Sequence, residues 1–299
     1  MLLKDFIRQG TERLEPLYPT SEARNIILML CEDRIGTKSY THLVEPERTI
    51  DDKSLELLEE DLGRLSSGEP IQYVTGSADF FGFKFKVTRD VLIPRPETEL
   101  LCQEAIKIGS RKQRMRQAYG NSKPVRILDL CTGSGCIAWT MALSIPGAEV
   151  IATDISEKAI MVAMEQDFAA LLKEKGALAP RFMIADVLGD DSQFGLGKFD
   201  LVLSNPPYIM ESQKSQMRVN VLGFEPQVAL FVPDEDPLLF YRAVSSWARN
   251  LLAPEGWGFV EINELLGPET RKVFLEAGFH DCEIVKDYNE KNRFIVFSR

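Results

Sequence analysis

The apolar positions along the chain follow two patterns, and the change between them divides the sequence into two regions. Over the first seventy residues, apolar side chains recur at spacings of three and four, which places them on one face of a helix. One such set comprises Leu55, Leu58, Leu62 and Leu65. A second helix is predicted over residues 22–31, with Gly36 closing its far end. We therefore expect residues 1–70 to form a small helical domain.

The composition changes after the sequence Gly68-Glu69-Pro70. β-forming and aromatic residues are frequent from residue 72 to residue 87, where Gly76 and Gly82 interrupt them. Such a segment predicts a β-hairpin. We expect residues 71–93 to contain this hairpin and to link the helical domain to the rest of the chain.

Short apolar strands alternate with helices in the remaining region, residues 94–299. Seven strands are expected, at residues 125–130, 149–153, 181–185, 199–204, 256–262, 281–286 and 293–298. The last two are too close together for a helix between them. The alternation predicts an α/β domain with a doubly wound, mainly parallel sheet of seven strands that ends in an antiparallel pair.

Charge and cysteine content narrow the possible functions. The net charge of -10 argues against an enzyme of DNA or RNA, which normally carries a basic surface to neutralise phosphates. The five cysteines are scattered and form no C-x-x-C pair, so neither a disulfide framework nor a metal site is predicted. No apolar run could span a bilayer, and the first residues do not have the form of a signal peptide. We therefore expect a cytoplasmic protein without a membrane partner.

The first candidate site is the glycine-rich segment from Asp129 to Gly135, where a strand runs into a helix. Glycines let the backbone turn sharply and lie against a ligand, and ligands in such folds bind beyond the carboxyl ends of the strands. The pattern Gly133-x-Gly135-x-x-Ala138 also fits a dinucleotide-binding loop. Asp154, nineteen positions after Gly135, could hydrogen-bond the ribose of NAD or of S-adenosyl-L-methionine. This loop alone leaves both cofactors open.

Two features favour S-adenosyl-L-methionine. Asp129 precedes the glycine turn, where its carboxylate can orient the loop near the ligand's ammonium end and would repel a pyrophosphate. The second feature is the end of the strand at residues 199–204, which stops at Asn205-Pro206-Pro207-Tyr208. Two prolines end the strand, and Pro206 holds Asn205 extended. A rigid corner is therefore expected where the methyl donor should lie.

This corner suits the methylation of a planar nitrogen, such as an amide or an exocyclic amine. The Asn205 side-chain oxygen and the Pro206 carbonyl can each accept a hydrogen from an NH2 group, and the Tyr208 ring can stack on its plane and lie near the sulfonium. Positioning and preorganised dipoles, rather than a strong base, would supply the rate. The two histidines, His42 and His280, lie outside every motif, and we expect both at the surface.

The Asn-Pro-Pro-Tyr corner is shared by DNA adenine methyltransferases and protein glutamine methyltransferases. Over essentially the whole chain, however, the sequence resembles the HemK/PrmC family of release-factor glutamine methyltransferases. The segments that carry this resemblance are GEPIQYVTG at residues 68–76, LIPRPETELL at residues 92–101, residues 129–135, residues 205–208, the motif Glu225-Pro226-x-x-Ala229-Leu230, and Lys286-Asp287 followed by Arg293. The sequence Arg-Pro-Glu-Thr-Glu is the most discriminating, since it separates this group from the ribosomal-protein glutamine methyltransferases.

The resemblance implies the class I S-adenosylmethionine-dependent methyltransferase fold, with a helical amino-terminal domain that docks the release factor. It implies that the enzyme methylates N5 of the glutamine in the Gly-Gly-Gln motif of peptide-chain release factors 1 and 2. We further expect a monomer that uses no metal and does not bind nucleic acid directly. Cofactor contacts are expected from Asp129, Cys131, Thr132, Gly133, Ser134, Gly135, Asp154, Asp186, Val187 and Asn205. The catalytic residues at the glutamine are expected to be Asn205, Pro206, Pro207 and Tyr208.

Two positions depart from the usual pattern of the family. Cys131 stands where glycine is commoner, and Asn263 follows Ile262 where the family more often has glycine. Neither change removes a proposed catalytic group. Cys131 is expected to crowd the methionine end of the donor slightly.

Other functions stay open from the residues alone. An adenine-N6 methyltransferase and a ribosomal-protein glutamine methyltransferase would share the corner, but the first should show a basic patch or a target-recognition insert, and neither is visible. A nicotinamide-dependent oxidoreductase would leave residues 205–208 without a role. A non-catalytic scaffold that retains the cofactor fold is disfavoured by the intact Asn205 and Tyr208.

Overall fold

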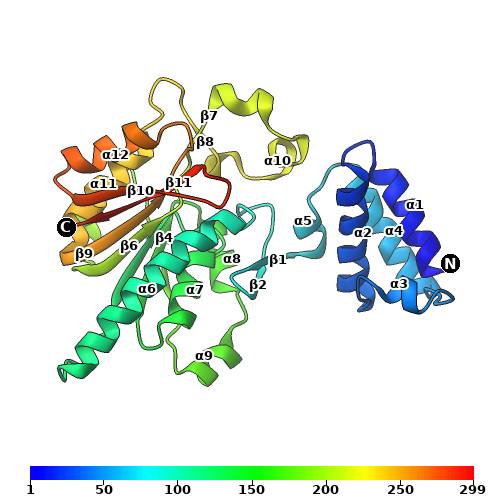
Figure 1. The fold of residues 1–299 in the computed structure, drawn as a ribbon, viewed down its shortest axis with the longest axis horizontal. Coiled ribbons are helices and arrows are strands. Elements are labelled where there is room, and N and C mark those ends of the chain that lie inside the picture. Colours follow the sequence, from blue (N-terminus) through cyan, green and yellow to red (C-terminus); the bar gives the residue numbers. More distant parts are fainter. The chain divides into compact units, whose positions relative to one another are not determined.

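The computed structural model describes residues 1–299, which fold as two compact units (Figure 1). The helical unit comprises Met1–Ser77 together with Met217–Glu225, and the sheet unit comprises Ala78–Gln216 and Pro226–Arg299. The sequence pattern assigned residues 217–225 to the catalytic domain, whereas in the structure they pack within the helical unit. There Arg218 donates to Glu22 at 2.6 Å. This long-range return of the chain carries no periodic signal in the sequence.

The helical unit is built around one apolar core. Its helices are α1 (Leu3–Leu14), α2 (Thr20–Ile35), α3 (Thr41–Val44), α4 (Asp52–Ser66), α5 (Ile71–Thr75) and α10 (Val219–Phe224). The predicted helix at residues 22–31 lies inside α2, which ends at Gly36 in the left-handed conformation. On α4, Leu58, Leu62 and Leu65 face the core as the spacing predicts. The surface position expected for His42 is wrong, since its side chain is buried with Nε2 2.6 Å from Arg24.

The segment after Pro70 differs from the expected hairpin, because its first residues form the helix α5 instead of a strand. The extended Pro70 precedes this helix, and Gly76, at a φ of 77°, ends it in the left-handed conformation that glycine adopts without strain. Val74 is buried in the core of the helical unit. The hairpin itself is shorter, with β1 at Ser77–Phe80 and β2 at Phe83–Lys86. Burial of apolar side chains has overridden local β preference in residues 72–75.

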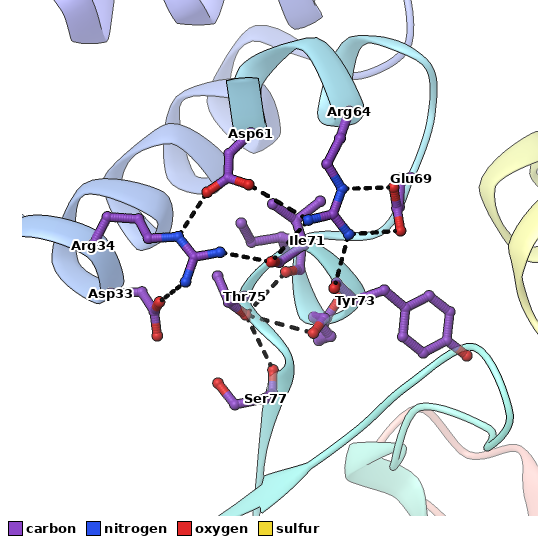
Figure 2. Close-up of polar contacts among 11 residues, drawn as sticks. Asp33, Arg34, Asp61, Arg64, Glu69, Ile71, Tyr73, Thr75 and Ser77 are labelled. Carbon is purple, nitrogen blue, oxygen red and sulfur yellow. Dashed lines mark hydrogen bonds and ion pairs between the residues drawn. The ribbon is translucent and has the colours of Figure 1, made fainter. Parts of the chain in front are cut away.

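Two arginines hold the end of α5 against the rest of the helical unit (Figure 2). Arg34 donates to the Val74 carbonyl at 2.7 Å, and Arg64 donates to the Tyr73 carbonyl at 3.2 Å. The last carbonyls of a helix have no partner within it, so side-chain donors of positive charge stabilise them. A helix this short depends on such contacts, because it is too short to be stable by itself.

The same arginines are held in place by buried carboxylates. Arg64 donates twice to Glu69, at 3.0 and 2.9 Å, and Arg34 donates to Asp61 at 2.6 Å. Glu69 and Asp61 are each 3% exposed. Buried charges are costly unless they are paired, so each carboxylate needs its arginine in place, and each arginine is in turn held by its carboxylate. The motif at residues 68–76 therefore has a structural role, since its Glu69 fixes the arginine that holds α5.

The sheet unit contains a seven-stranded sheet with the order β10-β11-β9-β6-β3-β4-β5. Its strands are β3 (Arg126–Leu130), β4 (Glu149–Asp154), β5 (Arg181–Ile184), β6 (Phe199–Ser204), β9 (Leu252–Glu261), β10 (His280–Lys286) and β11 (Asn292–Ser298). β11 runs antiparallel to both β10 and β9, and the other neighbours pair in parallel. The predicted α/β class, strand number and final antiparallel pair are confirmed, and the order is that of class I methyltransferases.

Helices cover both faces of this sheet (Figure 1). One face packs against α6 (Pro96–Ala118), α7 (Cys136–Ser144) and α9 (Ala169–Lys175), and the other against α11 (Leu239–Leu251) and α12 (Gly267–Glu276). Successive side chains of a strand point to opposite faces, so Ile127 enters the first layer and Leu128 the second. α8 (Glu157–Met164) follows β4. Burial on both faces explains why the strands read as continuous apolar runs.

Strand register aligns the carboxyl ends of β3, β4 and β6. Leu130 pairs with Thr153 on one side and with Ser204 on the other. The residues that follow these positions, Asp154 and Asn205 among them, therefore meet at one edge of the sheet. Beyond β6, the short strands β7 (Ile209–Met210) and β8 (Phe231–Val232) pair in parallel.

No helix is long and apolar enough to cross a bilayer, and no three His, Cys, Asp or Glu side chains gather as a metal site would require.

The arginine contacts at α5 predict a local loss of stability when one is removed. Arg64→Ala leaves the buried Glu69 carboxylate without these two hydrogen bonds, so we expect the opening free energy of α4 and α5 to fall by about 2–4 kcal/mol. Hydrogen exchange of the amides in these helices measures this quantity. Arg13→Ala is the matched control, since Arg13 pairs with Glu59 at the exposed surface and should change stability by less than about 1 kcal/mol. Equal effects of the two variants would contradict the role given to Arg64.

Candidate active site

A cavity of about 270 Å³ opens at the carboxyl edge of β3, β4 and β6. All the residues around it belong to the sheet unit. The predicted site residues that line it are Cys131, Thr132, Gly133, Ser134, Asp154, Asp186, Val187, Asn205 and Pro207. Those that lie outside its lining are Asp129, Gly135, Pro206 and Tyr208. The structure thus brings most of the predicted site together in one cavity, and the other four residues are neighbours of these in the sequence.

Two glycines of the loop after β3, Gly133 and Gly135, have different structural roles. Gly133, at a φ of 55°, has no atom within 4 Å of the position a Cβ would take, so its missing side chain leaves space at the cavity. Gly135, at a φ of 79°, packs closely, because a Cβ there would meet Ala163 at 3.1 Å and Trp139 at 3.0 Å. Gly133 therefore permits close approach of a ligand, and Gly135 permits α7 to begin directly after the turn.

Cys131 adopts a left-handed backbone conformation, with a φ of 61°. That conformation is strained for a residue with a Cβ, by about 1–2 kcal/mol, and is free of strain for glycine. The usual glycine at this position is thereby explained. Burial raises the pKa of the Cys131 thiol well above its ordinary value, so at neutral pH the side chain is an uncharged thiol at the cavity wall.

Two aspartates support the loop from different sides. Asp154 Oδ2 accepts from the Gly133 backbone N–H at 2.8 Å, and its Oδ1 accepts from Ser156 N–H at 2.9 Å. Asp154 also faces the cavity, where its carboxylate has further acceptor capacity. Asp129 is completely buried behind the loop, and its Oδ2 accepts from the Thr132 hydroxyl at 2.5 Å. Asp129 thus acts on the loop through Thr132 instead of lining the cavity.

The walls of the cavity are largely apolar. Residues 90–95, which precede α6, contribute one wall that the sequence reasoning did not assign to the site. Ile155 and Val187 contribute from the loops after β4 and β5, and Asp186 Oδ1 shapes its turn by accepting from Leu188 N–H at 2.9 Å. Apolar walls with a few carboxylates match the chemistry of a nucleoside with a ribose diol.

The Asn205–Tyr208 corner follows β6 directly. The side chain of Asn205 donates from Nδ2 to the Thr98 hydroxyl at 3.2 Å, and no hydrogen bond within the chain reaches its Oδ1. Tyr208 donates from its hydroxyl to Glu261 Oε1 at 3.0 Å. Burial raises the pKa of the Tyr208 hydroxyl well above its ordinary value, so it stays protonated.

Thr98 and Glu261 are polar residues of the corner that the sequence reasoning did not assign to the site. Thr98, in the first turn of α6, donates to Glu261 Oε2 at 2.6 Å, and both side chains are buried. Glu261 ends β9, and burial raises the pKa of its carboxyl. A signal for both was present, because Thr98 lies in the Arg-Pro-Glu-Thr-Glu motif and Glu261 is a charged residue inside an apolar strand pattern.

The carboxyl-terminal hairpin supports this corner. Arg293 on β11 donates to Asp287 Oδ2 at 2.7 Å from Nη2 and at 3.1 Å from Nε. The positive charge of Arg293 also acts on Glu261, where it lowers the pKa of the carboxyl against the larger, opposite effect of burial. This arrangement explains the motif of Asp287 followed by Arg293 as electrostatic support for the site.

Asn263, where the family resemblance leads us to expect glycine, connects the corner to the loop that contains Gln213. Its Nδ2 donates to the Tyr208 carbonyl and to Gln213 Oε1, both at 3.0 Å. Its own backbone N–H donates to the Tyr241 hydroxyl at 2.8 Å. The two bonds from the side chain are ones that a glycine could not make, whereas the backbone bond to Tyr241 is open to either residue.

Burial of Asp129 predicts a specific pH dependence of stability. Burial raises the pKa of its carboxyl to about 7, so the folded protein keeps a proton that the unfolded chain releases near pH 4. The stability from this group is present at acidic pH and is lost as the pH rises from about 4 to about 7. The Asp129→Asn variant cannot ionise at this position. As the pH rises over that interval, its free energy of unfolding should therefore increase relative to that of the native protein, by up to about 4 kcal/mol. Urea denaturation at several pH values measures it, and parallel pH profiles would contradict the burial argument.

Known proteins match this chain over both units. Residues 5–76 match the family described as PrmC N-terminal domain, and residues 102–222 match the methyltransferase small domain. The chain is 35% identical to the release factor glutamine methyltransferase of Bacteroides thetaiotaomicron, over 98% of each chain. It is 34% identical to that of Flavobacterium psychrophilum, over 99% of this chain and 98% of the relative.

A solved structure from Alicyclobacillus acidocaldarius, described as a release factor-specific protein-(glutamine-N5) methyltransferase, is 28% identical. It aligns over 72% of this chain and 99% of its own, with a TM-score of 0.41. The resemblance inferred from the motifs is confirmed by the two curated relatives, to which the chain is 35% and 34% identical over nearly its full length. The chain belongs to the release factor glutamine methyltransferase family.

Proposed function

We propose that this protein transfers a methyl group from S-adenosyl-L-methionine to the side-chain amide nitrogen, N5, of the glutamine in the Gly-Gly-Gln motif of peptide-chain release factors. The observation that carries the proposal is the Asn205 side chain, whose Nδ2 is engaged by Thr98 while its Oδ1 stays available beside the cavity. The chain is 34–35% identical, over nearly its full length, to relatives named for this activity, and this supports the same substrate.

The cavity fits the methyl donor. Gly133 leaves the space a ligand needs, and the Asp154 carboxylate can accept from a ribose diol. Ile155, Val187 and Leu92 offer apolar surface to an adenine ring. Bound there, S-adenosyl-L-methionine supplies an electrophilic methyl group on a positively charged sulfur. Asp129 and Gly135 contribute indirectly, through the shape of the loop.

The corner performs the orientation that an amide substrate requires. An amide nitrogen is a poor nucleophile because its lone pair is delocalised into the carbonyl. Asn205 Oδ1 and the Pro206 carbonyl each accept one hydrogen of the substrate NH2, which turns the nitrogen lone pair toward the methyl carbon. Pro207 keeps this turn rigid, and the Tyr208 ring covers the amide plane.

The reaction balances without a strong base. The glutamine nitrogen forms a bond to the methyl carbon while the carbon–sulfur bond breaks. The electron pair of that bond passes to sulfur, which leaves as neutral S-adenosylhomocysteine, and the methylated nitrogen then carries the positive charge. That nitrogen is very acidic, so its surplus proton passes to water. Fixed acceptors at Asn205 and Pro206 stabilise the charge as it develops, which is the contribution that raises the rate.

The physiological partners follow from the same proposal. Release factors 1 and 2 are the substrates, the helical unit docks them, and the enzyme acts as a monomer in the cytoplasm. The net charge of -10 disfavours nucleic acid as the direct substrate. Adenine-N6 methylation and ribosomal-protein glutamine methylation use the same kind of corner, so they are the outcomes that an experiment must separate.

Asn205→Ala should lower turnover on release factor by about 10²–10³-fold, because it removes one preorganised acceptor. Mass spectrometry of release factor after incubation with enzyme and donor measures the added methyl group. Donor affinity, measured by calorimetry, should fall much less, since most donor contacts come from the glycine loop and Asp154.

Matched substrates complete this test. Native release factor should gain one methyl group on the loop glutamine, and a variant with that glutamine replaced should gain none. DNA and ribosomal protein, assayed with labelled donor, should stay unlabelled. Methylation that persists in the glutamine variant, or full activity of Asn205→Ala, would contradict the proposed function.

A further inference from the structure

Four buried or half-buried side chains form one continuous line of hydrogen bonds behind the corner. Asn205 Nδ2 donates to Thr98 Oγ1 at 3.2 Å, and Thr98 Oγ1 donates to Glu261 Oε2 at 2.6 Å. Tyr208 donates to the other oxygen of the same carboxylate at 3.0 Å. The line joins three elements of the sheet unit, which are the start of α6, the end of β9 and the turn after β6.

The direction of this line is determined by the chemistry of its members. Glu261 accepts at both of its oxygens, from Thr98 at Oε2 and from Tyr208 at Oε1, as an ionised carboxylate does. The Thr98 hydroxyl has one hydrogen, and at 2.6 Å it gives that hydrogen to Glu261. Toward Asn205, Thr98 can therefore only accept. The Asn205 amide must turn its Nδ2 to Thr98, and its Oδ1 then points the other way.

We propose that Thr98 and Glu261 are positioning residues that lock the Asn205 amide with its Oδ1 toward the methyl-accepting nitrogen. The proposal rests on the proposed function, in which this oxygen accepts a hydrogen of the glutamine NH2. A flipped Asn205 would present two hydrogens to a group that also carries hydrogens, so the acceptor amide would lose its partner. Without the lock, both orientations of a terminal amide have nearly the same shape, and a fraction of the enzyme would be in the unproductive one.

Variants at Thr98 test the lock by kinetics. Thr98→Val keeps the side-chain shape and removes the hydroxyl, so kcat on release factor should fall about 10- to 100-fold, as for a misplaced catalytic group. The KM for S-adenosyl-L-methionine should change by less than about threefold, and Thr98→Ser, which restores the hydroxyl, should recover most of the lost kcat. Unchanged kcat in Thr98→Val would overturn the proposal, as would a Thr98→Ser variant as slow as Thr98→Val.

Thr140→Val is the matched control. Thr140 on α7 is also completely buried, but its hydroxyl has no hydrogen-bond partner, so the same substitution there should leave kcat unchanged. A loss of kcat in Thr140→Val equal to that in Thr98→Val would mean that the effect comes from the removal of a buried hydroxyl in general, and this outcome would overturn the lock.

A spectroscopic measurement separates failure of the lock from failure of the proposed function. In protein labelled with ¹⁵N-asparagine, the side-chain NH2 signals of Asn205, assigned by their loss in Asn205→Ala, report the bond to Thr98 without any substrate. We expect these signals to shift and to exchange faster with water in Thr98→Val, and to stay unchanged in Thr140→Val. Unchanged signals in Thr98→Val would overturn the lock whatever the enzyme methylates, whereas a shift without glutamine methylation would overturn the function alone.

Discussion

A carboxylate buried at the end of β9 needs hydrogen-bond donors, and the Asn205–Tyr208 corner is arranged around the donors it receives. Glu261 is 1% exposed, and Thr98 and Tyr208 each donate to one of its oxygens. An unpaired charge at this depth would be very costly, so losing either donor would destabilise the folded state. Thr98 also accepts from Asn205, and Tyr208 belongs to the corner itself, so the donors of this one buried carboxylate link both residues of the corner to the end of β9.

The topology of the sheet determines where this corner meets the donor cavity. From β3 the chain proceeds outward to β4 and β5, and it then returns to place β6 on the opposite side of β3. Loops leaving β3 and β6 therefore diverge at this point, which opens a crevice at the carboxyl ends of the strands. The glycine loop follows β3 and Asn205 follows β6, so the two halves of the site lie on either side of this crevice.

Local sequence signals predicted the elements that depend on local chemistry. The apolar runs located the seven strands, Gly133 and Gly135 marked the loop, and the two prolines marked the corner after β6. The bond between Thr98 and Glu261 joins residues 163 positions apart, and no spacing rule connects them. Two other features could not be predicted from the sequence for the same reason, since they too depend on contacts between distant residues. α5 is helical because of tertiary contacts, and the segment at residues 217–225 packs in the helical unit through partners such as Glu22.

In the proposed mechanism, the oriented Asn205 oxygen holds the NH2 group of a glutamine side chain. A crystal structure of the protein with S-adenosylhomocysteine and a peptide containing the Gly-Gly-Gln motif would show this contact. We expect the glutamine nitrogen to lie within hydrogen-bond distance of Asn205 Oδ1 and the Pro206 carbonyl, with Asn205 Nδ2 still bonded to Thr98. A glutamine amide bound away from these two oxygens, or an Asn205 side chain released from Thr98 in the complex, would contradict it.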